Sequence, residues 1–153
     1  MKFTSSVNVA ESLTRIRGSV LKALRVYESL NVEVGVFEGG KPREGKISNA
    51  ALAIIHEYGT DTIPQRSFLR AWSIERREEI LSNAEKAART VGRLGPGAAQ
   101  RALGVWMAAD VKKRIASNIP PPLAPSTIKR KGSSVALIDS GQLRAAVDWR
   151  PGK

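Results

Sequence analysis

The chain has 153 residues, a formal net charge of +11, 42% hydrophobic residues, 5% aromatic residues and no cysteine. These values describe one globular domain with a largely aliphatic core, and they exclude a disulfide framework and a thiolate metal site. The positive charge favours nucleic acid, an anionic membrane or an acidic protein surface as a partner, without choosing among them.

No stretch approaches the ~20 consecutive apolar residues of a membrane helix, and residues 1–11 lack the apolar core of a cleaved signal. The lack of cysteine fits a reducing cytoplasm. We therefore expect one soluble domain over residues 1–153, with no membrane contact and no export by a cleaved signal.

The first third of the sequence predicts a long helix, a strand and a loop. Apolar residues recur at three- and four-residue steps from Val9 to Tyr27, which predicts an amphipathic helix of about five turns, weakened at Gly18. Residues 32–37 alternate as in a half-buried strand, and a weaker alternation at residues 2–7 predicts a short edge strand. Residues 38–47, rich in glycine, proline and charge, predict an exposed loop.

Residues 51–70 predict the feature around which we expect the chain to be arranged, a rigid elbow between two helices. Ser48 is placed to cap the first helix, Gly59 to end it in a left-handed conformation, and Pro64 to fix the turn that follows. Helical spacing assigns the buried face to Ala51, Ile54, Ile55 and Tyr58, and the outward face to Asn49, Ala53, His56 and Glu57.

An elbow with a His-Glu pair on its outer side and a polar tip suits contact with another protein. The contact residues predicted for it are His56, Glu57, Tyr58, Thr60, Ile63, Pro64 and Arg66. A metal or acid-base site is the weaker interpretation, because a zinc helix needs a second histidine four residues along and the chain has only one histidine. We expect no metal, no cofactor and no enzymatic activity.

Two further long helices follow the elbow. The first is predicted over residues 67–91, starting at Ser67, and the second over residues 98–117, with a glycine- and proline-rich turn between them that predicts an antiparallel hairpin. The apolar stripes predicted to face the core are Leu69, Trp72, Ile80, Ala84, Ala87 and Val91 on the first helix and Ala99, Leu103, Met107, Val111 and Ile115 on the second.

The last third of the sequence changes character. Residues 119–134 are proline-rich and basic, which predicts an extended segment with a short helix from Ser126 that ends at Gly132. Asp139 and Gln142 have the spacing of a capping box around Gly141, and residues 143–149 alternate as a closing strand that pairs with residues 32–37.

The densest positive charge is predicted where Lys129, Arg130 and Lys131 are joined by Lys112, Lys113 and Arg114. One interpretation is a solvated face with cations near a helix C-terminus. The other is contact with phosphate backbones or an acidic neighbour, independent of base sequence and weakened by salt. A nucleotide site in residues 38–46 is not expected, since the loop lacks a phosphate-binding glycine motif.

Four sequence segments in order carry a family resemblance: residues 34–37 with the glycine-rich loop, residues 53–60 with 63–70, residues 122–132, and residues 137–143. Together they resemble the small neck or tail-completion proteins of long-tailed bacteriophages, also described as minor tail or virion-morphogenesis components. Ser67 stands where a second proline is common in that family, and Ser140 where threonine is common.

The resemblance implies an α+β subunit in which a small antiparallel sheet packs with three long helices and short helical turns. It also implies a non-catalytic homo-oligomeric ring, with six copies favoured over twelve, that joins the head connector to the tail-terminator or tail-tube proteins of a virion assembled in the bacterial host cytoplasm. Passing DNA would meet the ring through its phosphate backbone. The alternative is a basic nucleic-acid-binding module without sequence specificity, although no helix-turn-helix, zinc finger or aromatic sheet motif is visible.

Overall fold

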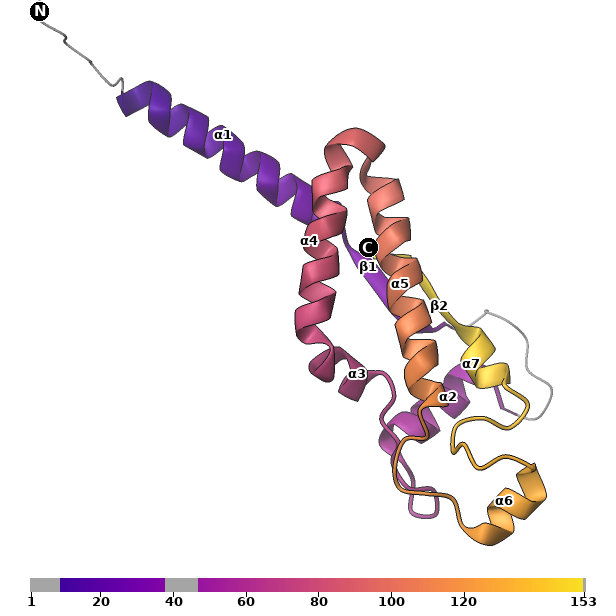
Figure 1. The fold of residues 1–153 in the computed structure, drawn as a ribbon. Coiled ribbons are helices and arrows are strands. Elements are labelled where there is room, and N and C mark those ends of the chain that lie inside the picture. The colour runs from indigo at the N-terminus through magenta and orange to yellow at the C-terminus, as the bar shows by residue number, and fades with distance from the viewer. Residues whose placement is uncertain (1–8, 38–46, 153) are drawn as a thin grey trace, which may run out of the picture.

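The computed structural model describes residues 9–37 and 47–152. Within these residues the chain forms seven helices and a two-stranded antiparallel sheet, so the predicted α+β fold is confirmed (Figure 1). The edge strand predicted at residues 2–7 and most of the loop predicted at residues 38–47 lie outside the described residues.

A helical hairpin forms the centre of the fold. It consists of α4 (Arg77–Leu94) and α5 (Pro96–Ala116), and the turn between them is a single glycine, Gly95, with a φ of 80°. Proline suits the first position of α5 because that position needs no backbone N–H. The predicted stripe on α5 lies in the core, with Val111 and Ile115 completely buried. The predicted hairpin is confirmed, although its first helix begins at Arg77, ten residues later than predicted.

The predicted single helix over residues 67–91 is wrong, because the chain forms two helices there. The first, α3 (Arg70–Glu75), is separated from α4 by Arg76, whose φ of −100° and ψ of 13° are not helical. Asp110 of α5 explains the break: its Oδ2 accepts hydrogen bonds from the Trp72 indole and from Nε of Arg76, both at 2.9 Å. A tertiary contact thus overrides a continuous apolar pattern.

The sheet pairs β1 (Val32–Val36) with β2 (Val147–Pro151), so that Val34 faces Trp149 and Val36 faces Val147. The pairing of these two segments is confirmed. However, the predicted strand begins four residues too early, since residues 142–146 form the short helix α7 (Gln142–Ala146). Within α7, Leu143 and Ala146 are both buried, which is helical spacing rather than strand alternation.

The core has two parts along α5. The larger one gathers Phe68, Trp72, Val111, Ile115 and Val147 with their neighbours from the elbow and the sheet. The smaller one joins the root of β1 to the hairpin through Leu30, Ala87, Ala99 and Leu103. The elbow is therefore fixed to the sheet and the hairpin through Phe68 and Trp72.

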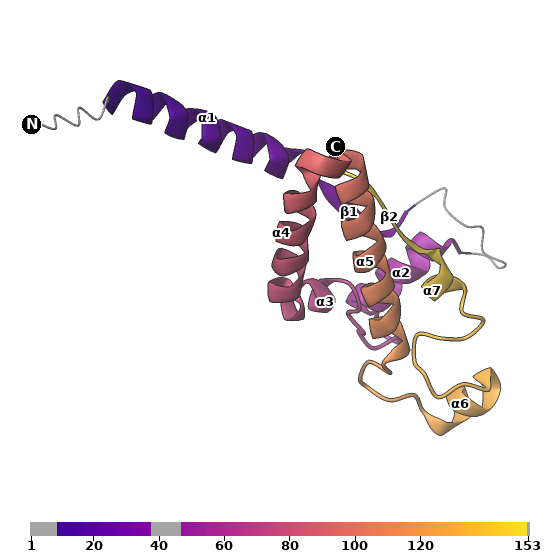
Figure 2. The same ribbon diagram turned by 45° about the horizontal axis from the view of Figure 1, so that its top comes forward.

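The N-terminal helix α1 (Val9–Glu28) leaves this body as an arm. Figures 1 and 2 show it pointing away from the other helices, with only its C-terminal end near α4. The amphipathic helix predicted here is confirmed. Yet Val20 of its predicted apolar stripe is 52% exposed, and its neighbour Leu21 is 47% exposed.

Candidate functional site

The orientation predicted for the elbow's first helix, α2 (Asn49–Tyr58), is wrong. Ile54 and Tyr58 are 60% and 64% exposed, whereas Asn49 and Glu57, predicted to point outward, are 5% and 7% exposed. The predicted cap is present, since Oγ of Ser48 accepts a hydrogen bond from the Ala51 N–H at 3.0 Å. The apolar pattern misassigned the faces because the following backbone requires Glu57 inside.

Glu57 holds the start of α3. Its carboxylate accepts the backbone N–H groups of Phe68, Leu69 and Arg70, each at 3.0 Å, and the hydroxyl of Ser67 at 2.5 Å. The first N–H groups of a helix have no partner within the helix, and the carboxylate satisfies two of them here, at Leu69 and Arg70, together with the N–H of Phe68 just before the helix. Oγ of Ser67 accepts the N–H of Ala71 at 3.1 Å, which agrees with its predicted place at a helix start.

The turn of the elbow depends on Gly59. It ends α2 with a φ of 76°, and its N–H donates to the carbonyl of Ile55 at 2.8 Å, so the predicted C-cap position is confirmed. Its ψ of 179° differs from the left-handed helical conformation that was predicted. A Cβ at this position would lie 2.8 Å from the backbone nitrogen of Gln65, because the chain doubles back here. The segment that follows the turn is held against α2 because the Arg66 N–H donates to the carbonyl of His56 at 2.8 Å.

Arg66 links the elbow to the proline-rich segment. The residue is only 4% exposed, and its Nε and Nη2 donate to the carbonyl of Pro121 at 3.0 and 2.7 Å. Glu57 and Arg66, predicted as exposed contact residues of the elbow, are both buried and bonded within the chain. Arg66 lines the pocket described below, and Glu57 does not.

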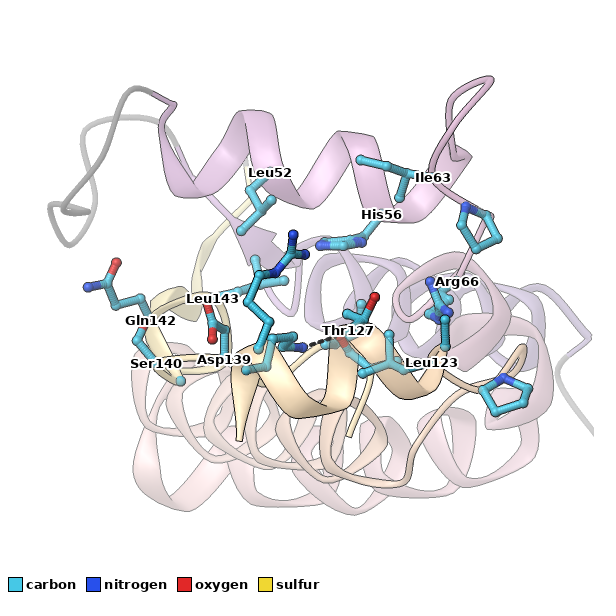
Figure 3. A pocket seen from close by; sticks show the side chains of 18 of the residues that line it. Leu52, His56, Ile63, Arg66, Leu123, Thr127, Asp139, Ser140, Gln142 and Leu143 are labelled. Atoms are coloured by element: carbon cyan, nitrogen blue, oxygen red, sulfur yellow. Dashed lines mark hydrogen bonds between the residues drawn. The ribbon is translucent and has the colours of Figure 1, made fainter. Parts of the chain in front are cut away.

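The elbow, the proline-rich segment and the turn before α7 together enclose a pocket of about 550 Å³, which we call the elbow pocket (Figure 3). In Figure 3 the side chains of Leu52, His56 and Ile63 face those of Leu123 and Thr127 across this space. The residues lining the pocket are Leu52, His56, Thr62, Ile63, Pro64, Arg66, Pro122, Leu123, Ala124, Thr127, Arg130, Lys131, Ala136, Leu137, Asp139, Ser140, Gly141, Gln142 and Leu143.

The pocket is positively charged. Among its described lining residues, Arg66, Arg130 and Lys131 carry positive charge and Asp139 alone carries negative charge. Burial lowers the pKa of Lys131, and the nearby cations Arg66 and Arg130 add to this effect while Asp139 opposes it. Burial also lowers the pKa of Arg66. These cations repel one another in a partly desolvated space, so an anionic group that enters the pocket is favoured.

The basic helix that forms one wall, α6 (Pro125–Lys131), ends at Gly132 with a φ of 68° as predicted, although it begins at Pro125 rather than Ser126. Lys131 bends back over the next turn, and its Nζ donates to the carbonyl of Ala136 at 3.0 Å. The predicted capping box at Asp139 and Gln142 is wrong. The N-cap of α7 is Gly141, with a φ of 77° and no side-chain cap, so the helix starts two residues later than Asp139 requires.

The structure brings together predicted residues that the sequence keeps far apart. His56, Ile63 and Pro64 line the elbow pocket, and so do Arg130, Lys131, Asp139, Gly141 and Gln142. Tyr58, Thr60 and Lys129 are exposed outside it. Lys112 and Lys113 lie on α5 and do not line the pocket, so the predicted patch is divided.

The sequence patterns did not single out Leu52, Thr62, Leu123, Thr127, Leu137 or Leu143, although all of them line the pocket. The signal was their place in the chain, because four of these six residues belong to the family-like segments 122–132 and 137–143, and Thr62 lies in the turn between residues 53–60 and 63–70. Leu52 precedes its segment by one residue.

No protein-family model, curated protein or solved structure matches this chain. In residues 9–37 and 47–152, no group of three or more His, Asp or Glu side chains is arranged to hold a metal ion. Within the same residues, no helix is both long enough and apolar enough to cross a membrane.

Proposed function

We propose that this chain is a structural subunit of a tailed-phage virion, a neck or tail-completion protein that forms a ring, of six copies rather than twelve, between the head connector and the tail-terminator or tail-tube proteins. The observation that carries the proposal is the elbow pocket. Three segments that resemble the family, which contribute residues as far apart in the chain as His56 and Leu143, meet around one basic pocket. In the proposed ring the pocket receives an acidic segment of a neighbouring protein, and no catalytic step takes place.

The shape and charge of the pocket support a protein partner. Its walls carry apolar side chains such as Leu52, Leu123 and Leu143 beside the cations. A concave surface with apolar walls and a few placed polar groups accommodates a side chain or a short peptide. A DNA backbone, by contrast, is usually contacted by an exposed basic surface.

Exposed apolar side chains elsewhere support assembly. Ile54, Tyr58, Ile74 and Val105 are each more than half exposed. Scattered apolar residues are normal on a monomer. Together with an N-terminal arm that projects from the body, however, they favour a protein that functions in a complex.

The test compares two neighbouring cations on α6 in a complementation experiment with a phage or prophage whose own copy of the gene is deleted. Arg130 lines the pocket and Lys129 does not, although both are exposed. We expect deletion to leave separate heads and tails in electron micrographs, wild-type protein to restore joined particles, and Arg130→Glu to fail where Lys129→Glu succeeds. Joined particles without any copy of the protein would overturn the proposal.

The same two variants separate this function from the nucleic-acid-binding alternative, which the exposed cations of α6 favour. A phosphate backbone responds to net charge, so both charge reversals would weaken DNA binding and its salt dependence to a similar degree. Equal effects of Arg130→Glu and Lys129→Glu on duplex DNA affinity, with no effect on particle joining, would support that alternative.

A further inference from the structure

A second surface of the body is apolar and open, and it shares no lining residue with the elbow pocket. It is a groove of about 680 Å³ between α4, the root of β1 and α5, which we call the α4 groove. Its floor and walls include Leu30, Val32, Ile80, Ala84, Ala88 and Met107. The two alanines, one turn apart on α4, let another helix approach the backbone closely.

The α4 groove has acidic edges. The charged residues among its described lining are Glu28 and Glu85, and both are acidic. Leu81, which also lines the groove, is 41% exposed. An apolar floor with carboxylates at its edges suits a helix that is apolar on one side and basic on its flanks.

The α1 arm has this chemistry. Its sequence carries four basic residues against two acidic ones, and Arg15, Arg17, Lys22 and Arg25 are exposed. Val20 of its apolar stripe is also exposed, so the arm lies outside the core at that position. Most of the stability of a helix in a protein comes from packing of its apolar face, which indicates that the arm has a partner surface.

Among the α1 residues whose side chains the structure describes, only Glu28, the last one, lines the groove of its own chain. Only residues 29–31 connect α1 to β1, and hydrogen bonds fix this connection: the Ser29 N–H donates to the carbonyl of Arg25, and the Asn31 N–H to the carbonyl of Glu28. The carbonyl of Asn31 in turn accepts the N–H of Gly152. The arm therefore points away from the body, as Figures 1 and 2 show from two directions.

We propose that α1 of one copy docks in the α4 groove of the next copy, with its apolar stripe on Ala84 and Ala88 and its basic residues beside Glu28 and Glu85. The inference rests on the self-assembly part of the proposed function. Each copy gives an arm at one surface and receives one at another. This is a head-to-tail contact, which forms a ring when the rotation between copies closes. The 20 residues of α1 span about 30 Å.

The absence of cysteine makes the contact testable by cross-linking. Full-length copies with Val20→Cys are mixed with differently tagged full-length copies that carry Ala84→Cys or Ala88→Cys, and a short bismaleimide is added. We expect mixed pairs to form far more than with Val105→Cys, a matched control on α5 that is 54% exposed and lies outside the groove. Equal yields from the groove and control positions would overturn the docking.

A variant on the arm avoids damage to the body. Val20→Asp places a charge on the apolar stripe, and we expect self-association measured by analytical ultracentrifugation to weaken about tenfold or more. The helix content measured by circular dichroism should stay close to that of the wild type. The control is Ser19→Asp, at the neighbouring exposed position. Equal association of the two variants would contradict the proposal.

The outcomes separate the docking from the neck function. A ring in the virion without cross-links between arm and groove would overturn the docking alone. Specific cross-links in a protein that virions lack would support the docking and overturn the neck function.

Discussion

The carboxylate of Glu57 accepts the backbone N–H of Phe68 at 3.0 Å, and this bond joins the last turn of α2 to the most buried aromatic side chain of the core. Phe68 is 1% exposed and packs with Trp72, Val111 and Ile115. The geometry of the elbow pocket therefore depends on a buried acid that does not itself line the pocket.

Replacing Glu57 with glutamine should destabilise the protein by about 2–4 kcal/mol. In the variant the amide keeps one acceptor oxygen, but its NH₂ group faces the donors that the second carboxylate oxygen satisfies in the wild type. Each buried donor left without a partner costs about 1–3 kcal/mol. Urea unfolding at pH 7 measures the loss. The matched control is Glu78→Gln, an exposed acid in the first turn of α4, which should change stability by less than about 0.5 kcal/mol.

Regular spacing of apolar residues in the sequence was sufficient to predict most of the helices and strands. The apolar stripe from Ala99 to Ile115 repeats every four residues, so α5 and its buried face were predicted correctly. The alternation of residues 32–37 and the glycines at the ends of helices were equally informative, because each reports local backbone geometry. Pairing of β1 with β2 was predicted because a strand in a small domain needs a partner to be stable.

The errors arose where a distant group decides the structure. The faces of α2 were misassigned because the carboxylate of Glu57 is required by N–H groups eleven to thirteen residues later. The break at Arg76 depends on Asp110, 34 residues away. The elbow pocket likewise depends on how three remote segments meet. The order of the family-like segments pointed to this meeting, whereas the spacing of apolar residues did not.

Gly104→Ala should be strongly destabilising. Gly104 lies in the middle of α5, where alanine is ordinarily the better helix residue, but a Cβ there would overlap the indole ring of Trp149 on β2. Overpacking of a close contact costs about 1–3 kcal/mol or more, and it outweighs the gain in helix propensity. The melting temperature should fall, and hydrogen exchange should accelerate in β2.

A matched glycine gives the opposite result. Gly92 lies in α4, and no other side chain or loop comes within 4 Å of the place that an alanine methyl group would occupy there. Gly92→Ala should therefore stabilise the protein by about 0.4–1 kcal/mol. If the alanine variants at positions 92 and 104 were equally stable, the contact between α5 and Trp149 would not have the closeness described above.

Arg66→Lys should loosen the wall of the elbow pocket while leaving the helical hairpin intact. Nε and Nη2 of the guanidinium bind one carbonyl, that of Pro121, in a forked geometry that an ammonium group does not reproduce. Hydrogen exchange followed by mass spectrometry should show faster exchange in residues 122–131 and unchanged exchange in residues 97–115. Unchanged exchange in both regions would show that the arginine does not position this segment.

The ion pair between Glu75 of α3 and Arg114 of α5 should give the stability of the protein a small acid dependence. Arg114 donates to Oε1 of Glu75 at 3.0 Å through Nη2, and this hydrogen bond lowers the pKa of Glu75 from its ordinary value of 4.5. A lowered carboxyl pKa in the folded state means that the stabilisation is complete above the unfolded pKa and is lost as the pH falls through the folded pKa. Glu75→Gln should therefore be less stable than the wild type at pH 7, and the difference should shrink below pH 4.5. Thermal melts of both proteins between pH 7 and pH 3 measure the difference, and a gap that stays constant over this range would contradict the pairing.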